Sequence, residues 1–310
     1  MYRSHLEWLF QKGEFVVTAE IGSPRGSDLG ALQEQISIIR GYCDAVNVPD
    51  NPRGIPSMSS IVCSHFLLQQ GLEPIMQMTG RDRNRIAIQS DLYGAYALGI
   101  RNILLVSGDH VLLGTHPLTK MVFDVDSVLA LDLLEVMREG FDISGEELTG
   151  APDFFAGATL NPYSEPHDSQ VKRIIEKRNA GAQFFQTQAI YDMTPFETVM
   201  TEIEGLNLRV LAGIVPLRNS EMAELMNLRV PGIKVPKEFI RRLQDAEEGL
   251  FGDDRESAAR KVGLEIAIET IEAVKRIEGL NGIHIMGVGW PESVPELVKA
   301  TGLHPRLKRG

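Results

Sequence analysis

Two carboxylates in the 310-residue sequence lie at the ends of short apolar runs, a setting in which an acidic side chain can do chemistry. Glu20 belongs to the run Val16-Val17-Thr18-Ala19-Glu20-Ile21, where an ionised carboxyl group would lose hydration. Such surroundings raise the pKa of a carboxyl group and suit a general acid. The structural alternative for Glu20 is an ion pair with Arg25 or Arg81.

Asp109 follows a second apolar run, Ile103–Val106, as the last residue of Ser107-Gly108-Asp109. Gly108 would allow a ligand to approach the backbone closely, because glycine has no side chain. Asp109 is therefore the second candidate site residue. Its structural alternative is a turn or a helix N-cap.

Polar residues also follow the other apolar runs of the chain. They are Asn47, Asp50, Asn51, Gln77, Thr79, Arg81, His110, Asn161, Gln188, Tyr191, Asp192, Arg218 and Asn219, while Trp290 follows the last run. The segment Arg81-Asp82-Arg83-Asn84-Arg85 has the cations of a phosphate site, but it also fits a solvated helix start with Asp82 as N-cap. We favour the solvated helix start and expect at most one of these arginines to face a pocket.

Several catalytic and cofactor motifs are absent from the sequence. The seven histidines show no H-E-x-x-H spacing, and Ser107 does not lie in a G-x-S-x-G motif. Neither the G-x-G-x-x-G dinucleotide motif nor the G-x-x-x-x-G-K-[ST] loop occurs. Cys43 and Cys63 are too few for a disulfide framework, a Cys-rich zinc site or an iron–sulfur cluster. We expect no metal site and a reducing compartment.

The elements that must position these residues alternate between short apolar strands and longer helical patterns, which is typical of parallel βα units. The predicted strands are Phe15–Ile21, Ala45–Val48, Glu73–Met78, Asn102–Val106, Phe154–Leu160, Gln183–Thr187, Arg209–Ile214 and Gly282–Met286. The predicted helices are Leu29–Gly41, Ser59–Gln70, Arg83–Leu98, Asp126–Glu139, Ser169–Ala180, Pro195–Glu204, Pro236–Gln244 and Glu256–Glu278.

This alternation, without a Pro/Ser-rich linker, predicts an α/β fold in which residues 1–310 form a single (β/α)8 TIM barrel domain with a short amphipathic N-terminal helix. An open doubly wound sheet is the alternative fold. In a barrel, the chemistry lies at the carboxyl ends of the strands. The polar residues that follow the strands are therefore expected to meet at one mouth.

The composition limits the partners and the compartment. With 43% hydrophobic and 24% charged residues, the chain is expected to be globular. Its formal charge of −11 argues against binding to nucleic acid or to an anionic membrane. The sequence shows no run of 18 apolar residues and no signal-peptide core. We expect a cytoplasmic protein.

Three short motifs on the predicted strands resemble a known family. Thr18-Ala19-Glu20, Ser107-Gly108-Asp109 and Thr187-Gln188 are similar to active-site signatures of the methylenetetrahydrofolate reductase family. The resemblance extends from about Glu14 to Pro291 and includes Asn179–Ala182 and Gly213–Pro216. The order of the motifs and their places on successive strands make the combination specific.

The resemblance implies a barrel that carries a flavin, usually FAD with FMN as the alternative, and reduces 5,10-methylenetetrahydrofolate to 5-methyltetrahydrofolate. It implies that Glu20 is the general acid that protonates N10, and that Asp109 holds the pterin. Gln188 would orient the folate against the flavin. The residues that would contact the flavin are Gln77, Thr79, Val106, Ser107, Gly108, Asp109, Ala158, Asn161 and Lys177.

Lys177 would be the partner of the flavin diphosphate, and a solvated helix lysine is its structural alternative.

The chain departs from well-known bacterial members on the helix after the seventh strand and near the end. Met222 and Met226 stand where those members carry Gln and Phe, and Trp290 stands where they carry Arg. On the helix before the sixth strand, Arg173 and Glu176 replace Asn and Arg. Met226 and Trp290 are the expected apolar contacts of the substrate.

The electron donor is expected to be NADH, NADPH or an electron-transfer protein, and the chain a homo-oligomer or a subunit of a redox complex. Two other functions remain open. A non-redox barrel that transfers the methyl group of methyltetrahydrofolate would use ligands such as Asp50, Asn51 and Asp109 without a flavin. A non-catalytic barrel subunit would only bind partners.

Overall fold

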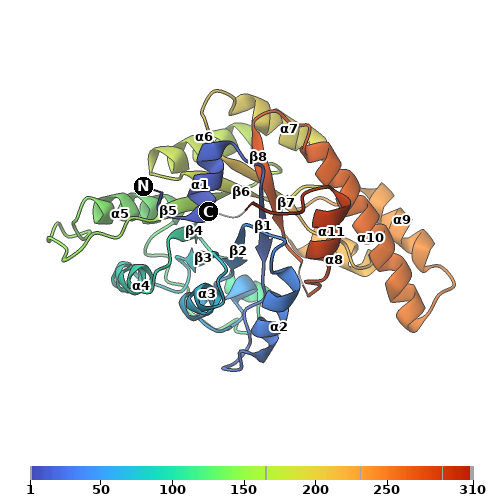
Figure 1. Cartoon of the computed structure of the whole chain (residues 1–310), viewed down its shortest axis with the longest axis horizontal. Helices are drawn as coiled ribbons and strands as arrows, with labels where there is room; N and C mark the ends of the chain where they lie inside the picture. Colours follow the sequence, from blue (N-terminus) through green and yellow to red (C-terminus); the bar gives the residue numbers. More distant parts are fainter. Residues whose placement is uncertain (1, 165, 231, 288, 308–310) are drawn as a thin grey trace.

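Eight parallel strands close into one barrel in the computed structural model, which describes residues 2–164, 166–230, 232–287 and 289–307 (Figure 1). The strands are β1 Val16–Glu20, β2 Ala45–Val48, β3 Pro74–Thr79, β4 Asn102–Val106, β5 Phe155–Leu160, β6 Phe184–Ala189, β7 Val210–Ile214 and β8 Leu280–Ile285. Each strand pairs with the next along the chain, and β8 pairs with β1. The predicted (β/α)8 fold is confirmed, and the open doubly wound alternative is wrong.

A ring of helices surrounds the barrel (Figure 1). Eight of them correspond to the predicted ranges: α2 Gly30–Ile39, α3 Ser60–Gln69, α4 Arg85–Ala97, α5 Ser127–Arg138, α6 His167–Asn179, α7 Met193–Glu202, α9 Lys237–Glu247 and α10 Gly252–Val274. Two further helices, α8 Ser220–Arg229 and α11 Ser293–Ala300, lie outside the ranges predicted from periodicity. Helix α8 buries only Ser220, Ala223 and Met226, so its apolar pattern is too sparse to predict a helix.

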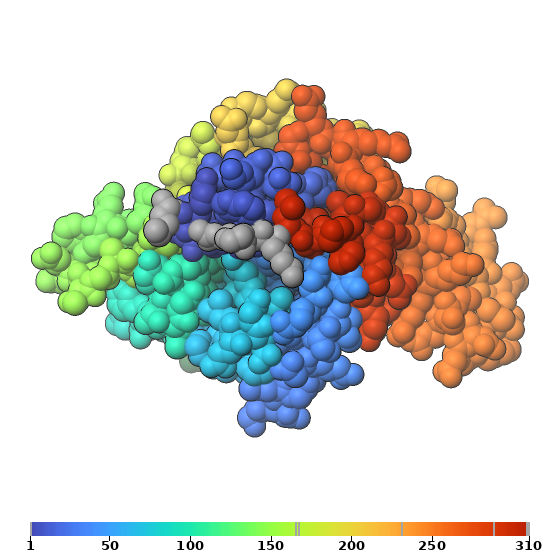
Figure 2. All heavy atoms as spheres, viewed as in Figure 1, coloured from blue at the N-terminus to red at the C-terminus, as the bar shows by residue number. Residues whose placement is uncertain are grey.

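The N-terminal end of the barrel is closed by α1, His5–Lys12. Ser4 caps this helix by accepting a hydrogen bond from the Glu7 N–H at 3.0 Å. The apolar side of α1 packs against a layer of inward-facing strand side chains, namely Val16, Ala45, Ile75, Leu104, Phe155, Phe184 and Leu211. Figure 2 shows α1, dark blue, over the middle of this face beside the red C-terminal elements. We call this apolar layer the barrel floor.

Strand residues two positions beyond the barrel floor also point inward, because side chains alternate between the two faces of a strand. On β1 the inward series runs from Val16 to Thr18 and Glu20, while Val17 and Ala19 pack in the core beneath the helices. The interior therefore changes from apolar to polar on the way to the carboxyl ends. Among the described residues, no helix combines the length and the apolar composition needed to cross a bilayer.

Candidate functional site

A polar layer lies above the barrel floor and occupies the interior of the barrel. It is formed by inward-facing side chains of β1, β2, β3, β6 and β8, namely Thr18, Glu20, Asn47, Gln77, Gln186 and His284. Buried polar groups are stable only where they find hydrogen-bond partners. In this layer the partners come from other strands of the barrel, so the closed sheet itself assembles the site.

Glu20 is the acidic member of this polar layer. Its Oε2 accepts a hydrogen bond from Gln77 Nε2 at 3.3 Å and lies 3.8 Å from His284 Nε2. The Glu20 side chain keeps 22% of its accessible surface, whereas that of His284 keeps 3%. Glu20 thus faces the open end of the barrel. Within the described part of the chain, neither alternative ion pair forms: Arg81 pairs with Asp82, and Arg25 is exposed.

Asn47 and Gln186 connect opposite sides of the barrel beneath the open end. Asn47 Nδ2 donates to Gln186 Oε1 at 2.6 Å, and Gln186 Nε2 donates back to Asn47 Oδ1 at 3.1 Å. Both side chains are buried. The reciprocal pair forms a rigid polar base for the site. Gln188, the next inward residue on β6, is half-buried above it.

The predicted strand ends at Thr187, which places Gln188 after it. In the structure β6 extends to Ala189, so Gln188 lies inside the strand. The pairing of β6 with β7 shifts register between Gln186 and Ala189. A β-bulge of this kind re-aims side chains at the end of a strand. The shift therefore lies at the position where Gln188 reaches the mouth.

Asp109 is exposed in the loop after β4 and contacts the β2 and β3 loops. Its Oδ2 accepts the Arg53 N–H at 3.0 Å, and its carbonyl accepts a hydrogen bond from Arg81 at 3.1 Å. Helix α5 is capped by Asp126, so Asp109 is not its N-cap. Gly108 has φ +91°, and a Cβ there would lie 3.0 Å from the Cβ of Arg81. The glycine lets this loop pack against β3.

Arg81 contradicts the prediction of a solvated helix start. Its side chain is 1% exposed and pairs with Asp82 at 2.6 Å. It also donates to the carbonyl of Asn51 at 3.0 Å. Although burial opposes it, the hydrogen bond from Arg81 holds the pKa of Asp82 below its ordinary value. The N-cap of α4 is Asn84 and not Asp82.

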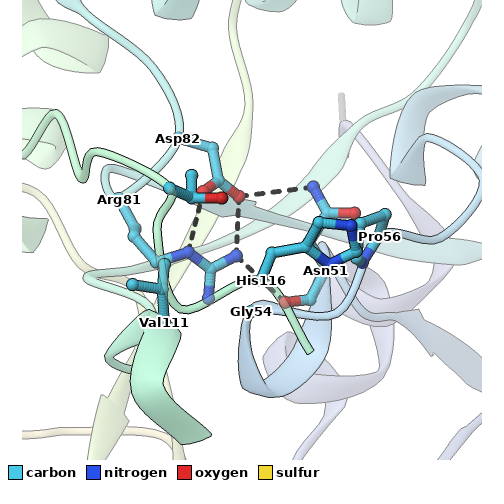
Figure 3. Close-up of a pocket in the computed structure, with 8 residues that line it drawn as sticks. Asn51, Gly54, Pro56, Arg81, Asp82, Val111 and His116 are labelled. Carbon is cyan, nitrogen blue, oxygen red and sulfur yellow. Dashed lines mark hydrogen bonds and ion pairs between the residues drawn. The ribbon is translucent and has the colours of Figure 1, made fainter. Parts of the chain in front are cut away.

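A cavity of about 120 Å³ lies between the β2, β3 and β4 loops (Figure 3). It is lined by Asn51, Gly54, Pro56, Arg81, Asp82, Val111, His116 and Thr119. Figure 3 shows the Arg81 guanidinium between Asp82 and the Asn51 carbonyl. One arginine of the cluster therefore faces a pocket, while Arg83 pairs with Asp50 and Asp91.

Lys177 is buried on α6, which contradicts the alternative of a solvated helix lysine. Its Nζ donates to the Thr159 carbonyl at 2.7 Å. Burial and, to a smaller extent, the nearby charge of Arg173 lower the pKa of Lys177 to about 8, although Asp126 opposes the shift. Arg173 itself pairs with Asp126 at 2.7 Å. The acidic chain thus holds a desolvated cation beside the end of β5.

Of the predicted flavin contacts in this region, Ala158 lies on β5 and Asn161 directly follows the strand. Ala158 is fully buried in the core beneath the helices, so its side chain points away from the barrel interior. Thr159, its neighbour, is exposed. Asn161 accepts the Tyr163 N–H at 3.0 Å and packs against Gly232, where a Cβ would lie 1.7 Å from Asn161 Nδ2.

The remaining predicted flavin contacts lie on β3 and β4. Gln77 bonds Glu20, and Thr79 is buried with its N–H bonded to Asp50 Oδ2 at 2.9 Å. Val106 is half-buried against the barrel floor, and Ser107 is exposed. These residues lie along the rim of the mouth between Glu20 and Asp109.

Met226 and Trp290, the predicted apolar contacts of the substrate, are both buried. The sulfur of Met226 accepts the Tyr191 hydroxyl at 3.9 Å. The Arg260 guanidinium lies 5.2 Å from the centre of the Trp290 ring. One face of that ring is therefore covered by a cation, and a substrate contact of either residue remains a prediction.

Sequence reasoning missed two residues of the site, Gln186 and His284. Gln186 lies two positions before Gln188, and His284 lies between Ile283 and Ile285, which pack beneath the helices. The period of two was the signal that could have identified them. A lone histidine in the apolar sequence Gly282–Met286 passes as a packing residue unless this alternation is applied.

Comparisons with known proteins agree with this arrangement. A family model described as methylenetetrahydrofolate reductase matches residues 3–302. A Caenorhabditis elegans protein named "Probable methylenetetrahydrofolate reductase (NADPH)" is 26% identical over 82% of this chain and 36% of its own length. "Methylenetetrahydrofolate reductase 2" of Schizosaccharomyces pombe is 25% identical over 74% of this chain and 35% of its own length. The chain spans about a third of the length of these relatives.

Two solved structures share the fold. A Clostridium thermocellum protein, described as binding two copies of 5-methyl-5,6,7,8-tetrahydrofolic acid, superposes with a TM-score of 0.64 at 17% identity. That match covers 97% of this chain and all of the other. EDTA monooxygenase from Chelativorans superposes with a TM-score of 0.53 at 10% identity over 93% of this chain and 94% of its own. At these identities the likeness shows the fold alone.

Proposed function

Because the chain belongs to the methylenetetrahydrofolate reductase family, we propose that it reduces 5,10-methylenetetrahydrofolate to 5-methyltetrahydrofolate with a bound flavin. The observation that carries this proposal is the placement of Glu20. It is a carboxyl group at the open end of the barrel, between the amide of Gln77 and the imidazole of His284. The folate-binding protein of the same fold supports the choice of ligand class.

Glu20 would act as the general acid. The five-membered ring of the substrate opens when N10 takes a proton and the bond between N10 and the methylene carbon breaks. The electron pair of that bond stays on N10, and an iminium carbon forms. Within the described part of the chain, no lysine or arginine contacts the Glu20 carboxyl group, so its oxygen atoms are available to the substrate.

Asp109, after β4, and Gln188, on β6, would both hold the folate at the mouth of the barrel. A carboxylate suits the N–H donors of a pterin and favours a developing positive charge. Asp109 Oδ2 accepts one backbone N–H, and the exposed carboxylate has further acceptor positions. Gln188 carries both a donor and an acceptor, so it can orient the folate ring.

Lys177 provides the test of whether the chain fits a flavin. An ammonium group has three donors, and the Thr159 carbonyl uses one of them. Within the described part of the chain, the other donors of Lys177 have no hydrogen-bond partner, and a buried cation with such donors fits the diphosphate of FAD, which FMN lacks. Gln77, Thr79, Val106, Ser107, Gly108 and Asn161 would line the remainder of that site, with Ala158 contributing its backbone. A bound flavin would supply the hydride that the iminium carbon accepts.

The electron donor would be NADH, NADPH or a reduced carrier protein, and the chain would act in the cytoplasm as a homo-oligomer or as a subunit of a redox complex. The apolar residues Met226 and Trp290, which lie beside Tyr191 and Arg260 respectively, would contact the substrate. We do not propose the non-redox methyl transfer, because Asp50 is held by Arg83 and by the Thr79 N–H.

A visible spectrum and two anaerobic half-reactions test this function. The purified chain, loaded with FAD if necessary, should show flavin absorption. It should be reduced by NADH, NADPH or a reduced carrier protein, and it should be reoxidised by methylenetetrahydrofolate with formation of methyltetrahydrofolate. A protein that binds neither FAD nor FMN would contradict the proposal. A flavoprotein whose reduced form is stable toward the folate would contradict the substrate.

A further inference from the structure

We infer that His284 is the positioning residue of Glu20 and that Thr18 orients the imidazole for this role. The inference rests on the proposed function of Glu20 as the proton donor. His284 is the last residue but one of β8, and its strand pairs with β1 so that Thr18 is opposite His284. The three side chains therefore meet across one pair of neighbouring strands.

The two ring nitrogens of His284 have different partners. Nδ1 lies 2.9 Å from the hydroxyl of Thr18, and Nε2 lies 3.8 Å from Oε2 of Glu20. The distance of 3.8 Å is longer than a hydrogen bond, and catalytic hydrogen bonds are often long before the substrate is bound. Thr18 is fully buried, so its hydroxyl finds its partners inside the protein.

The Thr18 hydroxyl allows two arrangements of the imidazole. Its oxygen also lies 3.5 Å from the Ile283 carbonyl. If the hydroxyl donates to that carbonyl, it accepts from Nδ1–H, and a lone pair on Nε2 faces a protonated Glu20. If the hydroxyl donates to Nδ1, then Nε2–H faces a Glu20 carboxylate. A neutral imidazole thus has an arrangement that matches Glu20 before proton donation and another that matches it afterwards.

The different exposure of Glu20 and His284 gives the two side chains different roles: Glu20 exchanges the proton, and His284 positions Glu20. The side chain of Glu20 is 22% exposed, whereas that of His284 is 3% exposed. Water therefore reaches Glu20 directly, and Glu20 regains from solvent the proton that it gives to N10. His284 holds the carboxyl group toward the mouth of the barrel while this exchange takes place.

Two substitutions separate the two contacts of His284. In His284→Gln the amide reaches the former position of Nε2, so a polar atom still faces Glu20. In His284→Asn the shorter amide reaches the former position of Nδ1, so the contact with Thr18 survives and the contact with Glu20 is lost. We expect His284→Asn to slow the folate half-reaction about ten- to hundredfold, the range of a mispositioned catalytic group. We expect His284→Gln to recover most of that loss.

Both variants should be reduced by the electron donor at the wild-type rate, because only the folate half-reaction needs the proton. Stopped-flow measurement of the two half-reactions at saturating folate gives the comparison. If the Asn and Gln variants reoxidise at the same rate, the positioning role is rejected. A merely structural role would change flavin content and thermal stability in both variants without separating their rates.

A second measurement does not depend on the folate reaction. The nitrogen chemical shifts of ¹⁵N-labelled histidine distinguish the tautomers of an imidazole. The signals of His284 are assigned among the seven histidines by their loss in His284→Gln. We expect Glu20→Gln to shift the Nε2 signal of His284 in the flavin-free protein. An unchanged signal would reject the contact, whereas a shifted signal with no folate reduction by the wild type would reject only the proposed function.

Discussion

The two ends of the barrel use the same residue type in opposite ways. At the N-terminal end, Glu73 accepts the N–H groups of His5 and Leu6 at 2.7 Å each and the Asn102 amide at 2.9 Å. At the open end, Glu20 accepts one hydrogen bond from Gln77. A carboxylate whose oxygens are saturated by the protein fastens a helix to the barrel. One whose oxygens are left open can exchange a proton with a ligand.

The same contrast runs along the strands. Val16 and Phe184 in the barrel floor are replaced two residues later by Thr18 and Gln186 in the polar layer. Burying an apolar side chain stabilises the fold by about 1.5–3 kcal/mol, whereas a buried polar group is costly unless it is hydrogen-bonded. We therefore expect the barrel floor to carry stability, and we propose that the polar layer carries the chemistry. Four substitutions test this division.

Glu20→Gln should have the largest effect of the four substitutions. It should slow the folate half-reaction without changing flavin reduction. The amide keeps the size of the side chain but cannot donate the proton to N10, so we expect the folate half-reaction to slow about 10²–10⁴-fold. Flavin reduction should keep its rate, because that step needs no proton from Glu20. Glu139→Gln, at an exposed position beside α5, is the control. Equal losses in both half-reactions would contradict the role of Glu20.

Phe184→Ala should affect stability alone. Phe184 is fully buried and stacks on Phe155 with ring centres 5.2 Å apart. Removing the ring should destabilise the protein by about 3–5 kcal/mol, measured by urea unfolding. Phe251→Ala, whose side chain is 85% exposed, should change stability by less than about 0.5 kcal/mol. A Phe184→Ala protein that is fully stable but slow in the folate half-reaction would contradict the division.

The division itself was largely predictable from the sequence. Eight apolar runs separated by helical patterns gave the barrel, and Glu20 was recognisable because it lies in one of those runs. Glu20, Gln77 and Asp109 could be placed at the mouth because parallel strands end on the same side. The period of two also determines which residues of each strand face the interior, and it is the pattern that identifies Gln186 and His284.

The burial of the cations could not be predicted in this way. Arg81 lies in a charged, polar segment, and it is buried only because the carbonyls of Asn51 and Asp109 approach it from two other loops. Lys177 is buried against the Thr159 carbonyl of the preceding strand. Trp290 is covered by Arg260 of α10. Such contacts depend on the relative placement of distant segments, which a local pattern does not contain.

Lys177→Met should weaken the binding of FAD about ten- to hundredfold, in line with about 1.5–3 kcal/mol for hydrogen bonds to a charged group. Lys172→Met, at an exposed position of the same helix, should bind FAD as the wild type does. Fluorescence titration of FAD measures both affinities. Equal affinities of the two variants would remove Lys177 from the flavin site.

The pH dependence of FAD binding gives a second readout of Lys177. Burial lowers the pKa of Lys177 to about 8, and a bound diphosphate would raise it, since it favours the charged ammonium. Proton linkage then requires that the affinity for FAD falls as the pH rises above about 8. Lys177→Met should lose this part of the pH dependence. A wild-type affinity that is constant between pH 7 and 10 would contradict the contact.

Glu73→Gln should have the smallest effect, and it tests the closed end. Burial raises the pKa of Glu73 above its ordinary value of 4.5, although hydrogen bonds from Leu6, Asn102 and His5 oppose the shift. The native state therefore binds more protons than the unfolded state between pH 4.5 and the raised pKa. Through this group the free energy of unfolding falls as the pH rises through that window.

Removing the titrating group should remove this decline in Glu73→Gln. At low pH the variant should be less stable than the wild type by about 1 kcal/mol, because an amide N–H replaces one acceptor of α1. The difference should shrink as the pH rises, since only the wild type carries the cost of a buried charge. Urea unfolding between pH 4 and 8 measures both curves, with Glu34→Gln on the exposed side of α2 as the control. Parallel curves for the wild type and Glu73→Gln would show that burial of the Glu73 carboxylate has no cost. The contrast between the two ends of the barrel would then rest on the apolar floor alone.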